Sequence, residues 1–195
     1  MKTATPGRSS RLVPTLVAVL FFGPLALAIA LYYVGGDRWR PSGSVAHGIL
    51  IPQPRSLPTG VLVLADGTTA DFVGKWSLLY VGRGDCDDAC KEGLYRTRQV
   101  RRALGKEGSR VQRFFISTGD APNAGFLAVE HPGLLVMTDA LAARDAVLAA
   151  LGEFHEGDAF VADPLGNLVL RFPAGTEMKD MHEDLQLLLK SSQIG

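Results

Sequence analysis

The sequence predicts a domain of the α/β class, a mixed sheet flanked by helices, behind a single N-terminal transmembrane helix. Three observations predict it: an uncharged apolar run near the N-terminus, alternating strand-like and helix-like segments after residue 60, and a nearly all-apolar segment among them. The 195 residues, 47% apolar and 21% charged, suit one globular domain plus a further segment. We divide the chain into an N-terminus (1–11), a transmembrane helix (12–34), a linker or arm (35–60) and a folded domain (61–195).

The run from Leu12 to Val34 contains no charged residue. Because roughly 20 apolar residues at about 1.5 Å rise cross a bilayer core, this run is long enough to span one. A cleaved signal peptide is the alternative, since Ala26-Leu27-Ala28 resembles a cleavage site, but the apolar run continues past it and favours an uncleaved anchor. Basic residues before the run predict that residues 1–11 are cytoplasmic. The expected location is the inner membrane, crossed once, with the soluble domain in the periplasm.

Residues 35–60 carry four prolines and a glycine pair, a composition that favours a linker or an extended arm over a packed element. Two strand-like segments, 61–64 and 68–72, then flank Asp66-Gly67, which is a hairpin signal. The segment from Trp76 to Val81 is nearly all apolar, as is typical of a strand buried on both faces.

The rest of the chain alternates between helical and strand patterns. We expect a helix from the cysteines to about Leu104, a strand at 111–117, a short helix near 125–130, a strand at 134–137, a helix at 140–151, strands at 158–162 and 168–172, and a helix at 177–190. Strands that alternate with helices imply a mixed sheet with helices on both faces. A closing hairpin followed by a helix matches the second half of a thioredoxin-like fold.

The chain has only two cysteines, Cys86 and Cys90, which lie between the predicted central strand and a helix start. The positive end of a helix dipole stabilises a thiolate there. If both lie in the first helical turn, the two sulfurs share one face and suit a soft ion such as Cu(I). A structural disulfide is the alternative, although closing so short a loop stabilises little. We favour functional cysteines.

A trigonal metal site needs a third ligand, and four histidines are available. His47 lies in the arm and His182 in the last helix, which makes both poor candidates, and His131 lies in a loop. His155 just precedes the strand 158–162, at the end of a thioredoxin-like sheet where the first helix also begins. His155 is therefore the best geometric candidate.

With these motifs the sequence resembles the SCO/SenC family of membrane-anchored, thioredoxin-like copper proteins, which assist assembly of cytochrome c oxidase. It looks closer still to a divergent branch of small bacterial membrane proteins found with oxidase genes. The resemblance covers about residues 61–190 in element order. It is carried by Gly74-Lys75, the strand 76–81, Cys86-Asp87-Asp88-Ala89-Cys90, Phe115-Ile116-Ser117, and the interval from His155 to Pro164 in the turn Asp163-Pro164-Leu165-Gly166.

The resemblance implies that Cys86, Cys90 and His155 are copper ligands, for Cu(I), Cu(II) or both. It implies as partner the copper-bearing subunit of cytochrome c oxidase or another assembly factor. The sequence also departs from the family pattern. Asp87 and Lys91 stand where prolines are usual, Gly82-Arg83-Gly84-Asp85 replaces an aromatic-rich approach to the motif, and Glu156 stands where Ser or Thr is usual.

Three functions fit these observations. The favoured one is a copper chaperone, and the second is a thiol–disulfide oxidoreductase acting on the oxidase's copper-site cysteines, with Cys86 and Cys90 as its catalytic residues. Exchangers of the second kind normally have two residues between their cysteines and a cis-proline opposite them, and no proline directly precedes the strand 158–162. The third is a non-catalytic assembly scaffold, so whether the chain is an enzyme stays open.

The net charge of the chain is zero. Nucleic-acid binding normally leaves a basic excess on a domain. We therefore expect no nucleic-acid partner.

Overall fold

The computed structural model describes residues 12–34, 46–64, 66–119, 122–138 and 142–192. The predicted cytoplasmic N-terminus (1–11), the first part of the predicted linker and the first two residues of the predicted helix 140–151 lie outside these ranges. The chain divides into two compact units, Met1–Ser44 and Val45–Gly195, which we describe separately.

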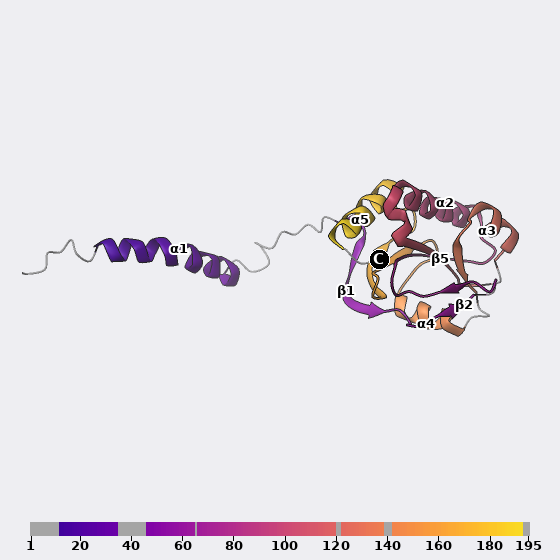
Figure 1. The fold of residues 1–195 in the computed structure, drawn as a ribbon, viewed down its shortest axis with the longest axis horizontal. Coiled ribbons are helices and arrows are strands. Elements are labelled where there is room, and N and C mark those ends of the chain that lie inside the picture. Colours follow the sequence, from indigo (N-terminus) through magenta and orange to yellow (C-terminus); the bar gives the residue numbers. More distant parts are fainter. Residues whose placement is uncertain (1–11, 35–45, 65, 120–121, 139–141, 193–195) are drawn as a thin grey trace, which may run out of the picture. The chain divides into compact units, whose positions relative to one another are not determined.

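The described part of the first unit, residues 12–34, is the helix α1 (Leu12–Val34) (Figure 1). Pro24 lies inside this helix. The span Val13–Ala30 is long and apolar enough to cross a membrane, judged by length and composition. An N-terminal signal sequence would meet the same criterion. The helix predicted at 12–34 is confirmed.

The second unit is built on a six-stranded sheet in the order β1-β8-β7-β4-β5-β6. Its strands are β1 (Ile49–Ser56), β4 (Trp76–Gly82), β5 (Val111–Ser117), β6 (Leu134–Met137), β7 (Ala159–Ala162) and β8 (Asn167–Phe172). The central strand β4 runs parallel to β5 and antiparallel to β7, and β5 runs parallel to β6. The mixed thioredoxin-like sheet expected from the sequence is confirmed.

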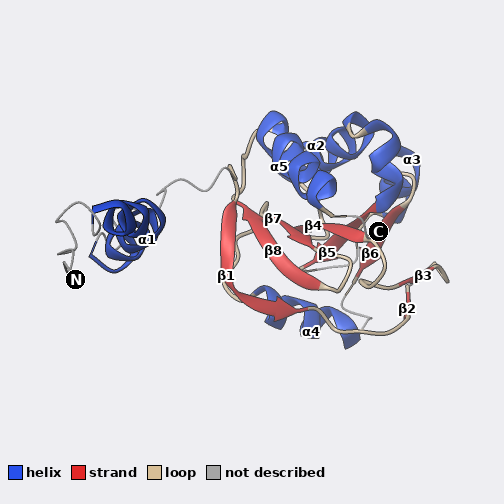
Figure 2. Ribbon diagram, turned by 60° about the vertical axis from the view of Figure 1, so that its left-hand side comes forward, coloured by secondary structure: helices blue, strands red, loops and turns tan. Residues whose placement is uncertain are grey.

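Helices cover both faces of this sheet (Figure 2). On one face lie α2 (Asp88–Ala103), α3 (Ala124–Glu130) and α5 (Met178–Ser191), and on the other lies α4 (Ala142–Leu151). A 3-10 helix (Gly105–Arg110) follows α2. Alternate residues of β4 enter the two cores, because Leu78 packs on the α2 side and Leu79 on the α4 side. Strand neighbours on both edges and helices on both faces bury β4 completely, as its apolar sequence predicted.

The expected hairpin around Asp66-Gly67 is present as a separate two-stranded sheet of β2 (Leu62–Val63) and β3 (Thr69–Ala70). The Asp66 carboxylate accepts a hydrogen bond from the Thr68 N–H, which closes the turn and lowers the pKa of Asp66. Gly67 adopts a φ of 80°, a conformation that a residue with a side chain seldom takes.

The prediction that all of 35–60 is a linker or arm is wrong for residues 49–56. They form β1, which pairs antiparallel with β8 at the edge of the sheet, with an irregularity between Leu50 and Arg55. Pro52 and Pro54 fall in that irregular part. Proline is tolerated there because an edge strand leaves one side unpaired and a bulge removes further ladder bonds.

Candidate thiol and metal site

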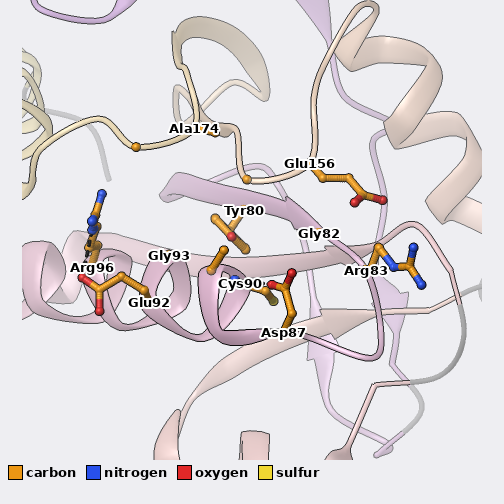
Figure 3. Close-up of a pocket in the computed structure, with 13 residues that line it drawn as sticks. Tyr80, Gly82, Arg83, Asp87, Cys90, Glu92, Gly93, Arg96, Glu156 and Ala174 are labelled. Carbon is orange, nitrogen blue, oxygen red and sulfur yellow. Dashed lines mark hydrogen bonds and ion pairs between the residues drawn. The ribbon is translucent and has the colours of Figure 1, made fainter.

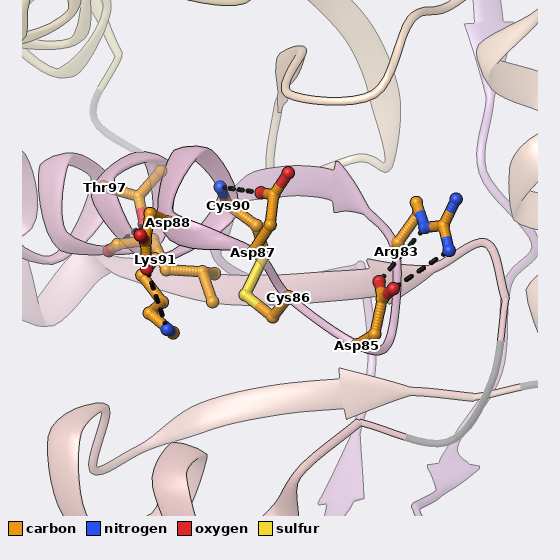
Figure 4. The surroundings of a disulfide bond; sticks show 9 residues. Arg83, Asp85, Cys86, Asp87, Asp88, Cys90, Lys91 and Thr97 are labelled. Carbon is orange, nitrogen blue, oxygen red and sulfur yellow. Dashed lines mark hydrogen bonds and ion pairs between the residues drawn. A yellow bond between two sulfur atoms is a disulfide. The ribbon is translucent and has the colours of Figure 1, made fainter.

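The two cysteines lie where β4 passes into α2, and they form a disulfide (Figure 4). Their Cα atoms are 5.0 Å apart, and both residues are buried, at 5% and 6% exposure. Among the described residues no cysteine is free. The pair is therefore in its oxidised state in this structure.

The first helical turn contains Cys90 but not Cys86, so the condition under which both sulfurs would share one face of the helix is not met. The helix begins after Asp87, which is its N-cap. The Asp87 carboxylate accepts a hydrogen bond from the N–H of Cys90 at 2.9 Å. Cys86 precedes this cap with a φ of 38°, and it is the one non-glycine residue with positive φ in the described ranges. Reversal of the chain at Cys86 turns its side chain back toward Cys90.

The loop before the disulfide carries an exposed ion pair. Arg83 donates to Asp85 through Nε at 3.0 Å and through a terminal nitrogen at 2.9 Å, which lowers the pKa of Asp85. The Arg83 guanidinium, whose positive charge would otherwise favour a nearby thiolate, is thus engaged by a neighbouring carboxylate. The helix start contributes the remaining positive potential near the sulfurs.

A cleft of about 360 Å³ opens beside the disulfide (Figure 3). One wall is the first part of α2, with Cys90, Gly93 and Arg96, and the opposite wall consists of loops that carry Glu156 and Ala174. Two backbone hydrogen bonds fix that opposite wall to the end of β4: Gly157 N–H to Val81 O at 2.8 Å and Val81 N–H to Asp158 O at 3.0 Å.

Tyr80 forms the floor of this cleft. Residue 93 must be glycine because a Cβ there would overlap the Tyr80 ring and hydroxyl. Burial, with a contribution from the Asp87 carboxylate, raises the pKa of Tyr80 to about 12. The phenol therefore stays protonated at neutral pH and offers an O–H donor to whatever enters the cleft.

His155 lies in the loop before β7, at the same end of the sheet as the cysteines, as expected. Its ring, however, is 83% exposed and contacts other groups: Nδ1 is 3.0 Å from a terminal nitrogen of Arg171 and 4.0 Å from the carboxylate of Asp158. Neither His155 nor Cys86 is among the residues that line the cleft. Across the described ranges, no group of three Cys, His, Asp or Glu side chains is assembled that could hold a metal ion.

Asp158 is a buried residue that the sequence analysis did not single out, and it organises the far wall of the cleft. Its side chain is 1% exposed and forms a 2.7 Å ion pair with Arg171. The same carboxylate accepts the N–H of His155 at 2.8 Å and the N–H of Ala174 at 2.9 Å, which ties the two wall loops together. In the sequence, the only sign of this role was an acidic residue at the start of an otherwise apolar strand.

The other three histidines lie elsewhere. His47 contacts Asp180 and Glu183 of α5, at 3.6 and 3.1 Å. His131 caps the end of α3, is 3% exposed, and packs edge-on against Phe126. His182 lies within α5. Of the four histidines, His155 is the one whose loop forms a wall of the cleft that Cys90 also lines.

A family model described as a transmembrane-like, thioredoxin-like, C-terminal domain matches residues 76–192. The chain belongs to this family. The matched segment of this transmembrane-like, thioredoxin-like protein begins at β4 and ends after α5, so it contains both cysteines and the histidine loop. No curated protein matches the chain.

Solved structures with the same fold include SCO proteins. Copper-bound ScoI from Bradyrhizobium japonicum is 22% identical, with a TM-score of 0.53, over 69% of this chain and 97% of that chain. Yeast Sco1 is 20% identical, with a TM-score of 0.59, over 71% and 100%. The SCO/SenC resemblance seen in the sequence is therefore confirmed at the level of the fold.

The thioredoxin domain of a thiol–disulfide oxidoreductase from Bacteroides vulgatus also shares this fold. It is 14% identical, with a TM-score of 0.51, over 75% of this chain and 99% of that chain. At such identities the similarity establishes the fold, and the fold hosts both kinds of protein.

Proposed function

We propose that the chain is a membrane-anchored copper chaperone, whose periplasmic domain binds copper through the reduced thiolates of Cys86 and Cys90 and the imidazole of His155. The ion is cargo, delivered to the copper-bearing subunit of cytochrome c oxidase. The proposal rests chiefly on one observation: the two cysteines are close enough to bond to each other at a helix start beside an open cleft.

The donor set suits this cargo. Two adjacent thiolates are soft ligands, which select Cu(I), and an imidazole suits copper in either oxidation state. Copper binding requires the disulfide to be reduced first, because a disulfide sulfur is not a thiolate ligand. The copper-bound SCO structures that share this fold support the choice of metal.

The position of His155 is compatible with a ligand that completes the site only when copper binds. The backbone of its loop is held by Asp158, whereas its ring is mostly in solvent and contacts Arg171 at 3.0 Å. Rotation of an exposed side chain costs little, so the ring can exchange its contact with Arg171 for the metal. Delivery of the ion to a partner benefits from such a releasable ligand.

The test is Cu(I) competition against a chromophoric chelator, with the reduced full-length chain in detergent micelles. We expect one Cu(I) per chain, and loss of competitive binding in Cys86→Ser and in Cys90→Ser. His155→Ala should weaken affinity at least about tenfold, a loss within the range seen when residues around a metal are changed. His47→Ala is the matched control and should bind as the unaltered chain does. Undiminished binding by the double serine variant would overturn the proposal.

The disulfide beside the cleft favours a second candidate function, thiol–disulfide exchange with cysteines of the oxidase. In this chain three residues separate the cysteines, and the residue directly before the segment 158–162, where exchangers have proline, is Gly157, which lines the cleft. The reduction potential of the pair separates the functions, because a catalytic couple lies near the potentials of its partners. An oxidase-assembly role that survives replacement of all three residues would instead indicate a scaffold.

A further inference from the structure

The cleft is lined by one of the two cysteines of the disulfide. Cys90 is among the residues that line it and Cys86 is not, although the two residues are equally buried. Cys90 belongs to α2, which forms the near wall, whereas Cys86 lies in the loop that precedes the Asp87 cap (Figure 4). Access to the disulfide from the cleft is therefore access to Cys90.

We propose that the disulfide is opened by an external thiolate that enters this cleft and attacks the Sγ of Cys90, so that Cys86 is the leaving thiolate. This inference rests on the proposed function, because the pair can hold copper only after reduction. It assigns the attacked sulfur to the second cysteine of the motif and makes the cleft the entry site for the reductant.

The chemistry balances with a thiol as the named reductant. A first thiolate forms a mixed disulfide with Cys90, the Cys86–Cys90 bond breaks, and Cys86 departs as a thiolate. A second thiolate attacks the external sulfur of that mixed disulfide, which releases Cys90 as a thiolate and an external disulfide. Two external thiols are oxidised, the protein disulfide gains two electrons, and the protons of the thiols pass to the protein thiolates or to water.

The surroundings suit this order of events. Cys86 lies directly before the N-terminus of α2, where the helix dipole stabilises a departing thiolate. The Tyr80 hydroxyl, protonated at neutral pH, provides a donor on the cleft floor. A cleft of about 360 Å³ is large enough for a peptide-sized thiol, since sites for small ligands begin at about 300 Å³.

The direct test maps the mixed disulfide on the unaltered, oxidised full-length chain in detergent. Reduced glutathione is added, the reaction is stopped within seconds by acid, free thiols are alkylated, and peptides are analysed by mass spectrometry. We expect glutathione on Cys90 and the alkyl group on Cys86, with at least about tenfold preference, because thiol exchange depends on which sulfur is accessible. Equal labelling, or glutathione mainly on Cys86, would overturn the inference.

A matched pair of variants tests the route. Ala89 lies beside Cys90 on α2 and lines the cleft, so Ala89→Phe fills the approach to the sulfur. Val129, 77% exposed on α3, does not line it, and Val129→Phe adds the same side chain elsewhere. Ala89→Phe should slow glutathione reduction of the disulfide at least about fivefold, since access limits exchange, while Val129→Phe leaves it unchanged. Equal rates in both variants would exclude the cleft as the entry site.

Failure of this inference and failure of the proposed function are distinguishable. Protein reduced by a phosphine, with no thiol present, reports copper binding irrespective of which sulfur glutathione attacks. Cu(I) bound normally while glutathione is found on Cys86 overturns only the inference. Glutathione on Cys90 with no Cu(I) bound by the phosphine-reduced chain overturns only the copper function.

Discussion

The cysteine segment (residues 86–90) and the histidine segment (residues 154–158) lie at the same end of the sheet but are held in opposite ways. The cysteine segment is fixed through its side chains, by a covalent bond and by the Asp87 cap. The histidine segment is fixed through its backbone by Asp158, while the ring of His155 is 83% exposed. The two cysteines of the proposed copper site are therefore held in place before a metal binds, whereas the histidine has a fixed backbone and a side chain that can rotate.

Removal of the carboxylate that holds the histidine segment should reduce the stability of the fold more than any other change considered below. Asp158→Asn leaves Arg171 without its buried partner and weakens the bonds to the N–H groups of His155 and Ala174. Breaking a buried ion pair costs about 3–5 kcal/mol, so we expect a loss near the lower end of that range in chemical denaturation.

The exposed pair Arg83–Asp85 in the cysteine loop provides the control. Asp85→Asn removes an equivalent carboxylate at the surface, where water and salt screen its interaction with Arg83. We expect no measurable change in the unfolding free energy. If the two variants have the same unfolding free energy, Asp158 does not hold the histidine segment, and the proposed difference between the two segments is wrong.

A buried histidine sharpens the contrast with exposed His155. Burial lowers the pKa of His131 to about 4, and the positive charges of Arg113 and Arg98 act in the same direction. The unfolded state binds a proton at His131 near pH 6.5, and the folded state does so only near pH 4. Below pH 6.5 proton binding therefore favours the unfolded state, and the free energy of unfolding decreases as the pH falls. By pH 4 the loss should approach about 3 kcal/mol.

The measurement is the unfolding free energy between pH 7 and pH 4 for the unaltered chain and for His131→Phe, which keeps a ring against Phe126. We expect the variant to lose less stability as the pH falls. His155→Ala, which removes an exposed ring, should follow the unaltered chain. An identical pH slope in His131→Phe would show that His131 does not titrate at a depressed pKa.

The smallest expected effect concerns the cysteine segment. Asp87→Ala removes the cap of α2 and leaves the Cys90 N–H without its partner, at a cost of about 1 kcal/mol. Asp88→Ala, one residue further along and fully exposed, removes a carboxylate that accepts no backbone N–H of the helix, and should cost less. A cost for Asp87→Ala no larger than that for Asp88→Ala would show that the disulfide alone holds this segment.

Local pattern was sufficient for most elements of the fold. The apolar run 76–81, the alternation of helix and strand after it, and the Asp-Gly turn each predicted the element that the structure contains. Local pattern did not predict β1, because Pro52 and Pro54 indicate a linker. A strand with these prolines is tolerated only at the edge of a sheet, and the position of β1 beside β8 cannot be read from the local sequence. Pairing with β8, more than a hundred residues away in the chain, is a tertiary contact that no local window contains.

At the candidate site, the types of the key residues, their spacing and their location at a helix start could be predicted from the sequence, because these depend on periodicity and on helix capping. Which groups meet depends on the tertiary structure. It joined Cys86 to Cys90, turned His155 toward Arg171, and buried Asp158 beneath both loops of the cleft wall. The physical reason is that side-chain orientation and burial depend on packing between elements distant in the chain, whereas strand and helix propensity depend on neighbours within a few residues.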